Sequence, residues 1–197
     1  MKYDFIEIGT SDFDTLIQST VGDIGLSIDP LQLYLDKLPD NPHVIKVNAA
    51  LSNVVGNCDV FWVDPNHITE YNLSWYLKGC NTINKPHPVT LKELKEKNLE
   101  HLMNKKEVSV IDWKTLVEIY DIKSVDLLKL DCEGHDCVIV NNILQLNTIL
   151  PKKIWFEAND LTPKETINNT IEKLINLHYN IIKNDGWDVI AERIQTK

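Results

Sequence analysis

The segment 125–136 constrains the fold of this chain more than any other part of the sequence. Its first half is a mainly apolar run, long enough for a β-strand that is buried on both faces. The run then changes abruptly to titratable side chains around a glycine, namely Asp131, Glu133, His135 and Asp136. Apolar residues at helical spacing follow from Cys137 onward. Buried strand, polar turn and amphipathic helix in this order are typical of an open α/β sheet, where ligands bind just beyond the carboxyl ends of the strands.

Two interpretations of this polar turn are open. Glu133 and Asp136 could serve only to cap the helix, since negative charge near a helix N-terminus is stabilising. Capping accounts for one or two acids, but not for four titratable groups within six positions. We therefore favour a functional role, because carboxylates at a strand end are costly unless they are paired or used.

Length and composition bound the class of protein. At 197 residues the chain is predicted to form one domain with a substantial core. Its net charge of −9 argues against nonspecific nucleic-acid binding, which requires a basic surface, and no apolar run reaches membrane-spanning length. The sequence enters its first strand directly after Met1 without a secretory signal, so we expect a cytoplasmic protein. The cysteines form no CxxC pair, which favours reduced thiols over a structural zinc site.

Strand and helix patterns alternate along most of the chain, which predicts βαβ units and a parallel sheet. The predicted strands are residues 3–9, 26–30, 44–51, 59–64, 108–111, 125–130 and 153–157, followed by a closing hairpin of 179–183 and 187–193. The predicted helices are residues 13–20, 31–38, 90–103 and 113–120, one that begins near Cys137, and one that begins after Thr162. Asp12 and Thr162 are the predicted N-caps of the first and last of these helices.

The alternation breaks at about residues 58–88, where no clean period remains. Loops of this length are usually functional or disordered, and this one contains Tyr71, Trp75 and Tyr76. Two interpretations are open. The excursion covers a binding site, or its aromatic side chains form a small core of their own. In either case we expect a single domain over residues 1–197.

Two further strand ends carry polar residues. The first strand ends in Glu7 and Gly9, and the second ends at Asp29, twenty residues after Gly9. In nucleotide-binding α/β folds, an acid at about this distance accepts hydrogen bonds from the ribose hydroxyls. Ser11 and Asp14 stand where the later glycines of a GxGxxG fingerprint would be, so a pyrophosphate would be poorly held. The pattern favours a nucleoside without phosphates over NAD, and Glu7 suits a cationic group such as a sulfonium or an ammonium.

S-adenosylmethionine meets these demands, and the sequence resembles the FkbM-type methyltransferases of the class I Rossmann-like fold. The matching segments cover most of the chain outside the excursion and are residues 5–10, 27–30, 47–53, 125–134 and 155–157. Residues 128–134 are the most specific, because they resemble the K-x-D-x-E-G signature of that family. The resemblance implies a three-layer αβα sandwich, with a mostly parallel seven-stranded sheet and an antiparallel C-terminal strand. It also implies O-methylation of a hydroxyl on a sugar, a glycan or a small metabolite.

The resemblance further implies which residues meet the donor. These are Glu7, Gly9, Thr10, Ser11, Asp29, Asn48, Ala50, Leu51 and Asp131. Glu7 and Gly9 would meet the methionine part of S-adenosylmethionine, and Asp29 would meet its ribose. Asn48, Ala50 and Leu51 would lie near the adenine, although Asn48 could instead close a turn.

Methyl transfer to a hydroxyl group needs in-line positioning and removal of the hydroxyl proton by a base or a metal ion. The candidate catalytic residues are Asp131, Glu133 and His135. His135 is predicted at a helix start, where the positive end of the dipole keeps an imidazole neutral and able to accept a proton. Asp131 is the competing base. Asp131, Glu157 and Asn159 also offer the oxygen ligands that Mg²⁺ prefers, which leaves a magnesium site as an alternative.

Two other functions are compatible with the sequence. The chain could be a non-catalytic binding module on a decayed methyltransferase fold, because the second glycine of the first loop is missing. An NAD-binding oxidoreductase is disfavoured by the incomplete glycine fingerprint. As partner we expect a small-molecule or glycan acceptor, with neither nucleic acid nor a membrane. We leave the oligomeric state open, with a homodimer as one option.

Overall fold

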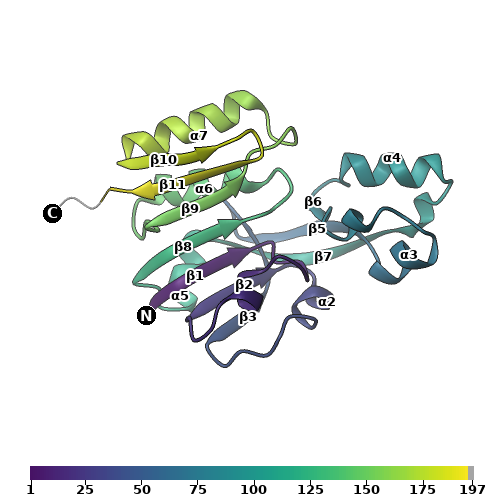
Figure 1. Cartoon of the computed structure of the whole chain (residues 1–197), viewed down its shortest axis with the longest axis horizontal. Helices are drawn as coiled ribbons and strands as arrows, with labels where there is room; N and C mark the ends of the chain where they lie inside the picture. Colours follow the sequence, from purple (N-terminus) through teal and green to yellow (C-terminus); the bar gives the residue numbers. More distant parts are fainter. Residues whose placement is uncertain (195–197) are drawn as a thin grey trace. The chain divides into compact units, whose positions relative to one another are not determined.

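A computed structural model describes residues 1–194 of the chain (Figure 1). Contacts between residues divide the chain into two compact units, which we treat separately. Unit 1 comprises residues 1–55 and the chain from Val110 onward, and unit 2 comprises residues 56–109. Unit 2 contains the predicted excursion and continues beyond it to Ser109. In the part of the chain that the structure describes, no helix has the length and apolar character needed to cross a lipid bilayer.

Unit 1 is built on a seven-stranded sheet in the order β10-β11-β9-β8-β1-β2-β3 (Figure 1). Its strands are β1 (Lys2–Ile8), β2 (Gly25–Asp29), β3 (Val44–Asn48), β8 (Ser124–Leu130), β9 (Lys153–Glu157), β10 (Tyr179–Asn184) and β11 (Asp188–Arg193). Neighbouring strands from β9 to β3 are parallel, whereas β11 lies between β9 and β10 and is antiparallel to both. The predicted α/β class, with a mostly parallel sheet and an antiparallel strand from the closing hairpin, is confirmed.

Apolar side chains pack on both faces of this sheet. Ile6 and Leu128 belong to the larger core, and Phe5 and Leu127 belong to a smaller cluster on the other face, because successive side chains of a strand alternate. The larger core includes side chains from α5 (Trp113–Ile119), α6 (Asp136–Leu146) and α7 (Lys164–Asn176). The smaller cluster includes side chains from α1 (Leu16–Ser19) and α2 (Gln32–Leu35).

The strand order places a topological switch point between β1 and β8. From β1 the chain passes to β2 and β3 on one side, and it later returns to β8 and β9 on the other side. In open α/β sheets, ligands bind in the crevice outside the carboxyl ends of the strands at such a point. Ile8 and Leu130, the last residues of β1 and β8, are paired with each other. Gly9 and Asp131 therefore follow directly at the switch point.

The predicted strand 44–51 is wrong as a single element. It is divided at Ala49 into β3 and a short strand, β4 (Ala50–Ser52), which pairs in parallel with residues Val110 to Asp112. The division follows from the Asn48 side chain, whose amide donates to the carbonyl oxygens of Asp29 (3.1 Å) and Pro30 (3.0 Å). Pairing between β2 and β3 ends at this residue.

Three predicted helix boundaries are also wrong. The first helix begins at Leu16 rather than Phe13, with Thr15 and not Asp12 as N-cap, because Ser11 (φ 49°) and Asp14 (φ 54°) have left-handed backbone. The helix predicted to reach residue 103 ends at Glu96. The last helix has Pro163 as N-cap, while the Thr162 hydroxyl donates to the carbonyl oxygen of Gly134 (3.3 Å).

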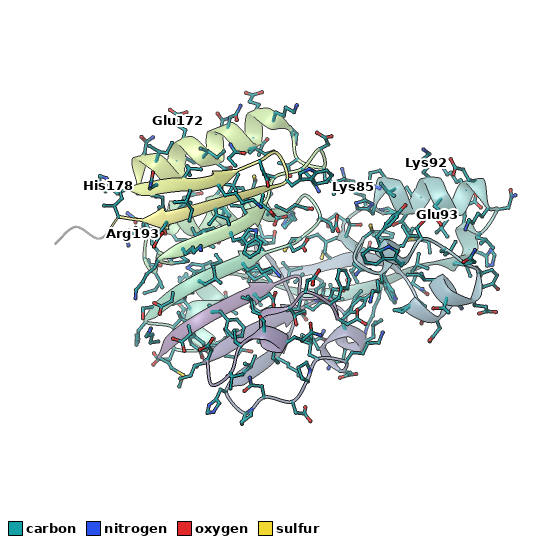
Figure 2. The ribbon with its side chains drawn as sticks, viewed as in Figure 1. Lys85, Lys92, Glu93, Glu172, His178 and Arg193 are labelled. Carbon is teal, nitrogen blue, oxygen red and sulfur yellow. The ribbon has the colours of Figure 1, made fainter. Side chains whose placement is uncertain are left out.

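Unit 2 has regular structure where the sequence showed no period. Its elements are β5 (Gly56–Val63), α3 (Pro65–Glu70), η1 (Trp75–Lys78), β6 (Thr82–Ile83), α4 (Pro88–Glu96), η2 (Glu100–Leu102) and most of β7 (Met103–Asp112). Figure 2 shows Glu93 on α4. Its carboxylate accepts a hydrogen bond from the N–H of Ser74 (2.8 Å) and pairs with Lys97 (3.4 Å), which ties α4 to the start of η1.

The core of unit 2 is aliphatic rather than aromatic. Its buried members are Val63, Ile68, Leu73, Leu77, Leu94 and Leu102. Trp75 is 68% exposed, and Tyr71 and Tyr76 are exposed as well. A small separate core therefore exists, but the aromatic side chains of the excursion do not form it. That the excursion covers an acceptor site stays a prediction.

Candidate functional site

Gly9 follows β1 and has a left-handed backbone (φ 80°). A Cβ atom at this position would lie 1.9 Å from the carbonyl oxygen of Asp131, at the end of β8. The N–H of Gly9 donates to the carbonyl oxygen of Ile28 in β2 (2.9 Å), and the N–H of Asp131 donates to that of Ile8 in β1 (3.0 Å), so the ends of three neighbouring strands are held together. The chain turns sharply at Gly9, and the close approach that requires glycine is made by the backbone of β8.

Asp29 ends β2, and its side chain is 5% exposed. One carboxylate oxygen accepts a hydrogen bond from the N–H of Ser11 (3.1 Å), and the other accepts one from the N–H of Leu31 (2.7 Å). Burial raises the pKa of Asp29 to about 7 in spite of these bonds. Asp29 thus lies beside the loop that follows Gly9 and fixes that loop, while its contact with a ribose stays a prediction.

The same loop buries two hydroxyl groups that have no partner. Thr10 is 2% exposed and Ser11 is 9% exposed. Their side-chain oxygens make no hydrogen bond with any described residue. Buried polar groups are normally paired, so these hydroxyls are available to a polar ligand at the switch point.

Glu7 is buried at the end of β1 and forms an ion pair with Lys129 of β8 (2.8 Å). Its second oxygen accepts a hydrogen bond from the N–H of Leu16, the first residue of α1 (2.8 Å). The Lys129 ammonium also donates to the carbonyl oxygen of Asp14 (2.7 Å) and lies 5.6 Å from the centre of the Trp155 ring. Burial raises the pKa of Glu7, and the attraction to Lys129 partly offsets that rise. Sequence reasoning gave Lys129 no role, although a lysine within an apolar strand was the available signal.

The residues expected near an adenine have structural roles in unit 1. The Asn48 amide closes the turn after β2, which was the alternative interpretation of this residue. Ala50 and Leu51 are buried in β4, and Leu51 is part of the larger core. None of the three lines the cavity of about 590 Å³ or the cavity of about 240 Å³ described below, and their contact with an adenine stays a prediction.

The turn from β8 to α6 is strained and tightly held. Glu133 (φ 50°) and Gly134 (φ 87°) both have left-handed backbone, and such residues cluster at functional sites. The fully buried Asp136 carboxylate accepts hydrogen bonds from the N–H groups of Cys132 (3.2 Å) and Glu157 (3.3 Å). Burial, with repulsion from Asp131, raises the pKa of Asp136 to about 7. Asp136 is therefore a structural residue that ties the turn to the end of β9.

A cavity of about 590 Å³ opens beside this turn. It is lined by residues 14–16, Gln18 and Ser19 after β1, and by Lys129, Leu130, Asp131, Trp155, Glu157 and Asp188 from the strand ends. The residues that line this cavity include Asp131 and Glu157 from the candidate site, but not His135.

The acids of this cavity are electrostatically crowded. The Asp131 side chain remains exposed, yet partial loss of hydration and repulsion from Glu133 raise its pKa to about 6. Burial, with repulsion from Glu133 and Asp131, raises the pKa of Glu157 to about 9. One buried oxygen of Glu157 has no hydrogen-bond partner within the described chain. Asp188 is paired with Lys183 (2.7 Å).

Asn159 does not join Asp131 and Glu157. Its side-chain oxygen accepts a hydrogen bond from the N–H of Leu161 (2.9 Å), and the residue lines a separate cavity of about 240 Å³. The structure thus brings together two of the three oxygen ligands suggested for Mg²⁺, and places the third elsewhere.

His135 is the N-cap of α6, and its Nε2 lies 2.9 Å from the Ser52 hydroxyl. That hydroxyl donates its proton to the side-chain oxygen of Asn53 (3.2 Å), so its oxygen accepts from Nε2–H, and Nδ1 is the basic nitrogen of the neutral ring. Burial lowers the pKa of His135, which favours this neutral form. Sequence reasoning missed Ser52, which is 83 positions away from its partner.

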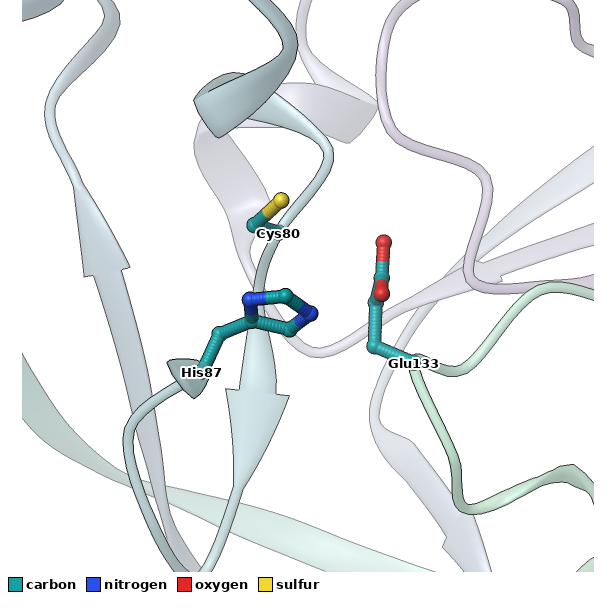
Figure 3. A group of neighbouring side chains, drawn as sticks. All are labelled: Cys80, His87 and Glu133. Carbon is teal, nitrogen blue, oxygen red and sulfur yellow. The ribbon is translucent and has the colours of Figure 1, made fainter. Parts of the chain in front are cut away.

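Two metal-binding residue types lie near each other within unit 2. Ligand atoms of Cys80 and His87 are within 4.8 Å of one another (Figure 3). The Nδ1 atom of His87 accepts a hydrogen bond from the N–H of Val89 (3.2 Å), which caps α4. Two ligands fall short of the four protein ligands of a structural zinc site.

No protein-family model matches the chain, and no curated protein matches it at a significant level. Function is therefore inferred from the geometry of the strand ends in unit 1.

Proposed function

We propose that this protein is an S-adenosylmethionine-dependent methyltransferase. The observation that carries the proposal is the set of acids at the ends of four neighbouring parallel strands around one switch point: Glu7, Asp29, Asp131 and Glu157. A seven-stranded sheet with an antiparallel strand from the closing hairpin also agrees with what the resemblance to FkbM-type methyltransferases implies.

The charge of these strand ends favours a cationic donor over a phosphorylated one. Lys129 is the basic side chain that lines the larger cavity, and its charge is already paired with Glu7. A pyrophosphate would meet carboxylates there without a free cation. A sulfonium would be attracted to the same groups, and the ribose of the donor would share Asp29 with the loop that follows Gly9.

The larger cavity is where we place the acceptor, a small molecule or a glycan whose hydroxyl is methylated. Asp131 lines this cavity, and its pKa of about 6 leaves it ionised at neutral pH and able to accept a proton. We therefore assign Asp131 as the base in preference to His135, which does not line this cavity. The reaction transfers the methyl group from sulfur to the acceptor oxygen, while the hydroxyl proton passes to Asp131.

One observation favours a second candidate, a non-catalytic binding module. Both oxygens of Asp29 already accept hydrogen bonds from the chain, and Glu7 is held by Lys129 and Leu16. In a decayed methyltransferase these acids would only hold the fold together.

Calorimetric titration of the full chain with S-adenosylmethionine tests the proposal. We expect wild-type binding, and a loss of about tenfold or more in Asp29→Asn, because hydrogen bonds to a charged acceptor contribute about 1.5–3 kcal/mol each. Asparagine preserves one acceptor for the backbone, so the fold should survive. Asp36→Asn is the matched control, since Asp36 is the exposed C-cap of α2 and its carboxylate accepts a hydrogen bond from the Gln32 side chain (2.7 Å). Absence of donor binding by the folded wild-type protein would reject the proposal.

A further inference from the structure

The larger cavity holds more acidic groups than the chain pairs with cations. Four acidic residues line it: Asp14 in the loop before α1, and Asp131, Glu157 and Asp188 at the strand ends. Lys183 pairs with Asp188, and Lys129 pairs with Glu7 behind the cavity wall. Within the described residues, Asp131 and Glu157 form no ion pair with a lysine or an arginine. Among the described residues, Asp131 and Glu157 therefore face the cavity from the strand ends with no cation paired to either of them.

Polar atoms in the cavity wall also lack partners. One oxygen of Glu157 is buried and makes no hydrogen bond with the described chain. Thr15 is 3% exposed and stands in a capping-box arrangement with Gln18, yet its hydroxyl has no acceptor for its proton. A buried acceptor and a buried donor in one wall point to a ligand that carries both hydrogen-bond donors and acceptors.

The spacing of the acids favours an organic cation over a metal ion as the ligand of this cavity. Among the described residues, the carboxylate oxygens of Asp131, Glu157 and Asp188 do not gather within 4.8 Å of one another, as ligands of a single ion would. Asn159, the other oxygen ligand considered, faces a different cavity. The acids instead lie around a volume of about 590 Å³, which fits an organic molecule several atoms long. The indole of Trp155 in the wall would pack against the apolar part of such a cation.

We propose that this cavity binds an acceptor that carries a protonated amine, such as an amino sugar or an amino alcohol, with its ammonium group between Asp131 and Glu157. The ammonium supplies the charge that these acids lack, and its N–H groups reach the unpartnered oxygen of Glu157. A hydroxyl of the same molecule accepts the unsatisfied Thr15 proton. Assigning the cation to the acceptor rests on the proposed methyl-transfer function, whereas binding of an ammonium compound by the cavity does not.

Binding of an ammonium compound should also release a proton from the cavity. An incoming ammonium favours the ionised form of Glu157, whose pKa is about 9 in the empty cavity, so binding at pH 7.5 should release a proton. A neutral ligand of the same shape brings no charge and should release none.

Calorimetry with the full chain tests this, with glucosamine and ethanolamine as cationic probes and N-acetylglucosamine as the neutral partner of glucosamine. We expect the cationic probes to bind and the neutral sugar to bind about tenfold more weakly or worse. Titrations in two buffers of different ionisation enthalpy should report proton release with ethanolamine, whose amine is fully protonated at pH 7.5. Glu157→Gln should lower glucosamine affinity about tenfold and abolish the release, because its amide cannot ionise.

The Glu157→Gln variant should fold, since the hydrogen bond to Asp136 is made by the backbone N–H of Glu157. Glu172→Gln is the matched control, because Glu172 is exposed on α7 and should leave binding unchanged (Figure 2). Equal affinity for the cationic and neutral sugars, no binding of either cationic probe, or no effect of Glu157→Gln would overturn the inference.

Two further titrations test whether the donor, a metal ion or the acceptor occupies the cavity. If saturating S-adenosylhomocysteine abolishes glucosamine binding, the ammonium site belongs to the donor and the acceptor assignment is wrong. If Mg²⁺ displaces glucosamine, the cavity is a metal site. Binding of glucosamine unchanged by both agents supports the inference. Failure of the proposed function would be seen separately, as no affinity for S-adenosylmethionine itself.

Discussion

The close approach of Gly9 to β8 permits a quantitative test of the site's architecture. Gly9 and Gly22 both have a left-handed φ, of 80° and 81°. A Cβ on Gly22 would meet no atom within 4 Å, whereas a Cβ on Gly9 would lie 1.9 Å from the Asp131 carbonyl oxygen and 2.8 Å from its carbon. These are backbone atoms that cannot rotate away. Gly22→Ala therefore measures the conformational cost alone, and Gly9→Ala adds the clash.

We expect Gly22→Ala to lower the free energy of unfolding by about 1–2 kcal/mol, the cost of a left-handed backbone for a residue with a Cβ. Gly9→Ala must also displace the loop, and with it the hydrogen bonds from Gly9 to Ile28 and from Asp131 to Ile8. At about 1 kcal/mol each, these raise the total to about 3–4 kcal/mol. Urea unfolding followed by tryptophan fluorescence gives both values. A difference between the two variants below about 0.5 kcal/mol would show that the strand ends do not approach as described.

Two further predictions concern the acids of unit 1. Folding raises the pKa of Asp29 and Asp136 to about 7 from an ordinary value of 3.8. Between about pH 4 and pH 7 the folded state therefore binds more protons than the unfolded chain, and the free energy of unfolding falls as the pH rises through that range. The urea midpoint should therefore be higher at pH 5 than at pH 8, with a smaller difference in Asp136→Asn, and a midpoint that rises with pH would contradict this. For catalysis, Asp131→Asn should lower kcat about a hundredfold or more, and wild-type activity should fall as pH drops through about 6, the pKa of Asp131. If His135→Asn is the more damaging change, the base is the Nδ1 atom of His135.

Local signals in the sequence predicted much of the fold. Asn184, Asp185 and Gly186 are strong turn residues, and the antiparallel hairpin lies where they placed it. The alternation of strands and helices predicted the parallel sheet and located Gly9, Asp29 and Asp131 at strand ends. These features depend on short-range periodicity and turn chemistry, which a single sequence carries.

The missed features depend on contacts between distant positions. Glu7 and Lys129 are 122 positions apart, so the lysine could be noticed in its strand but its partner could not. The pair formed by Ser52 and His135 was missed for the same reason. The first helix begins later than predicted because Ser11 has a left-handed backbone. The surrounding structure imposes that conformation on a residue other than glycine, so it could not be predicted from the local sequence.

The position of β11 has a consequence for synthesis of the protein. β10 is made before β11, yet in the sheet β11 lies between β9 and β10, and β10 pairs only with β11 among the described strands. Until β11 has left the ribosome, the outer edge of β9 is open, and β10 has no strand to pair with. An open strand edge is a template for association with other chains. The nascent protein is thus most prone to aggregate in the interval between synthesis of β9 and docking of the hairpin, and a chaperone that shields this edge would raise the yield of folded protein.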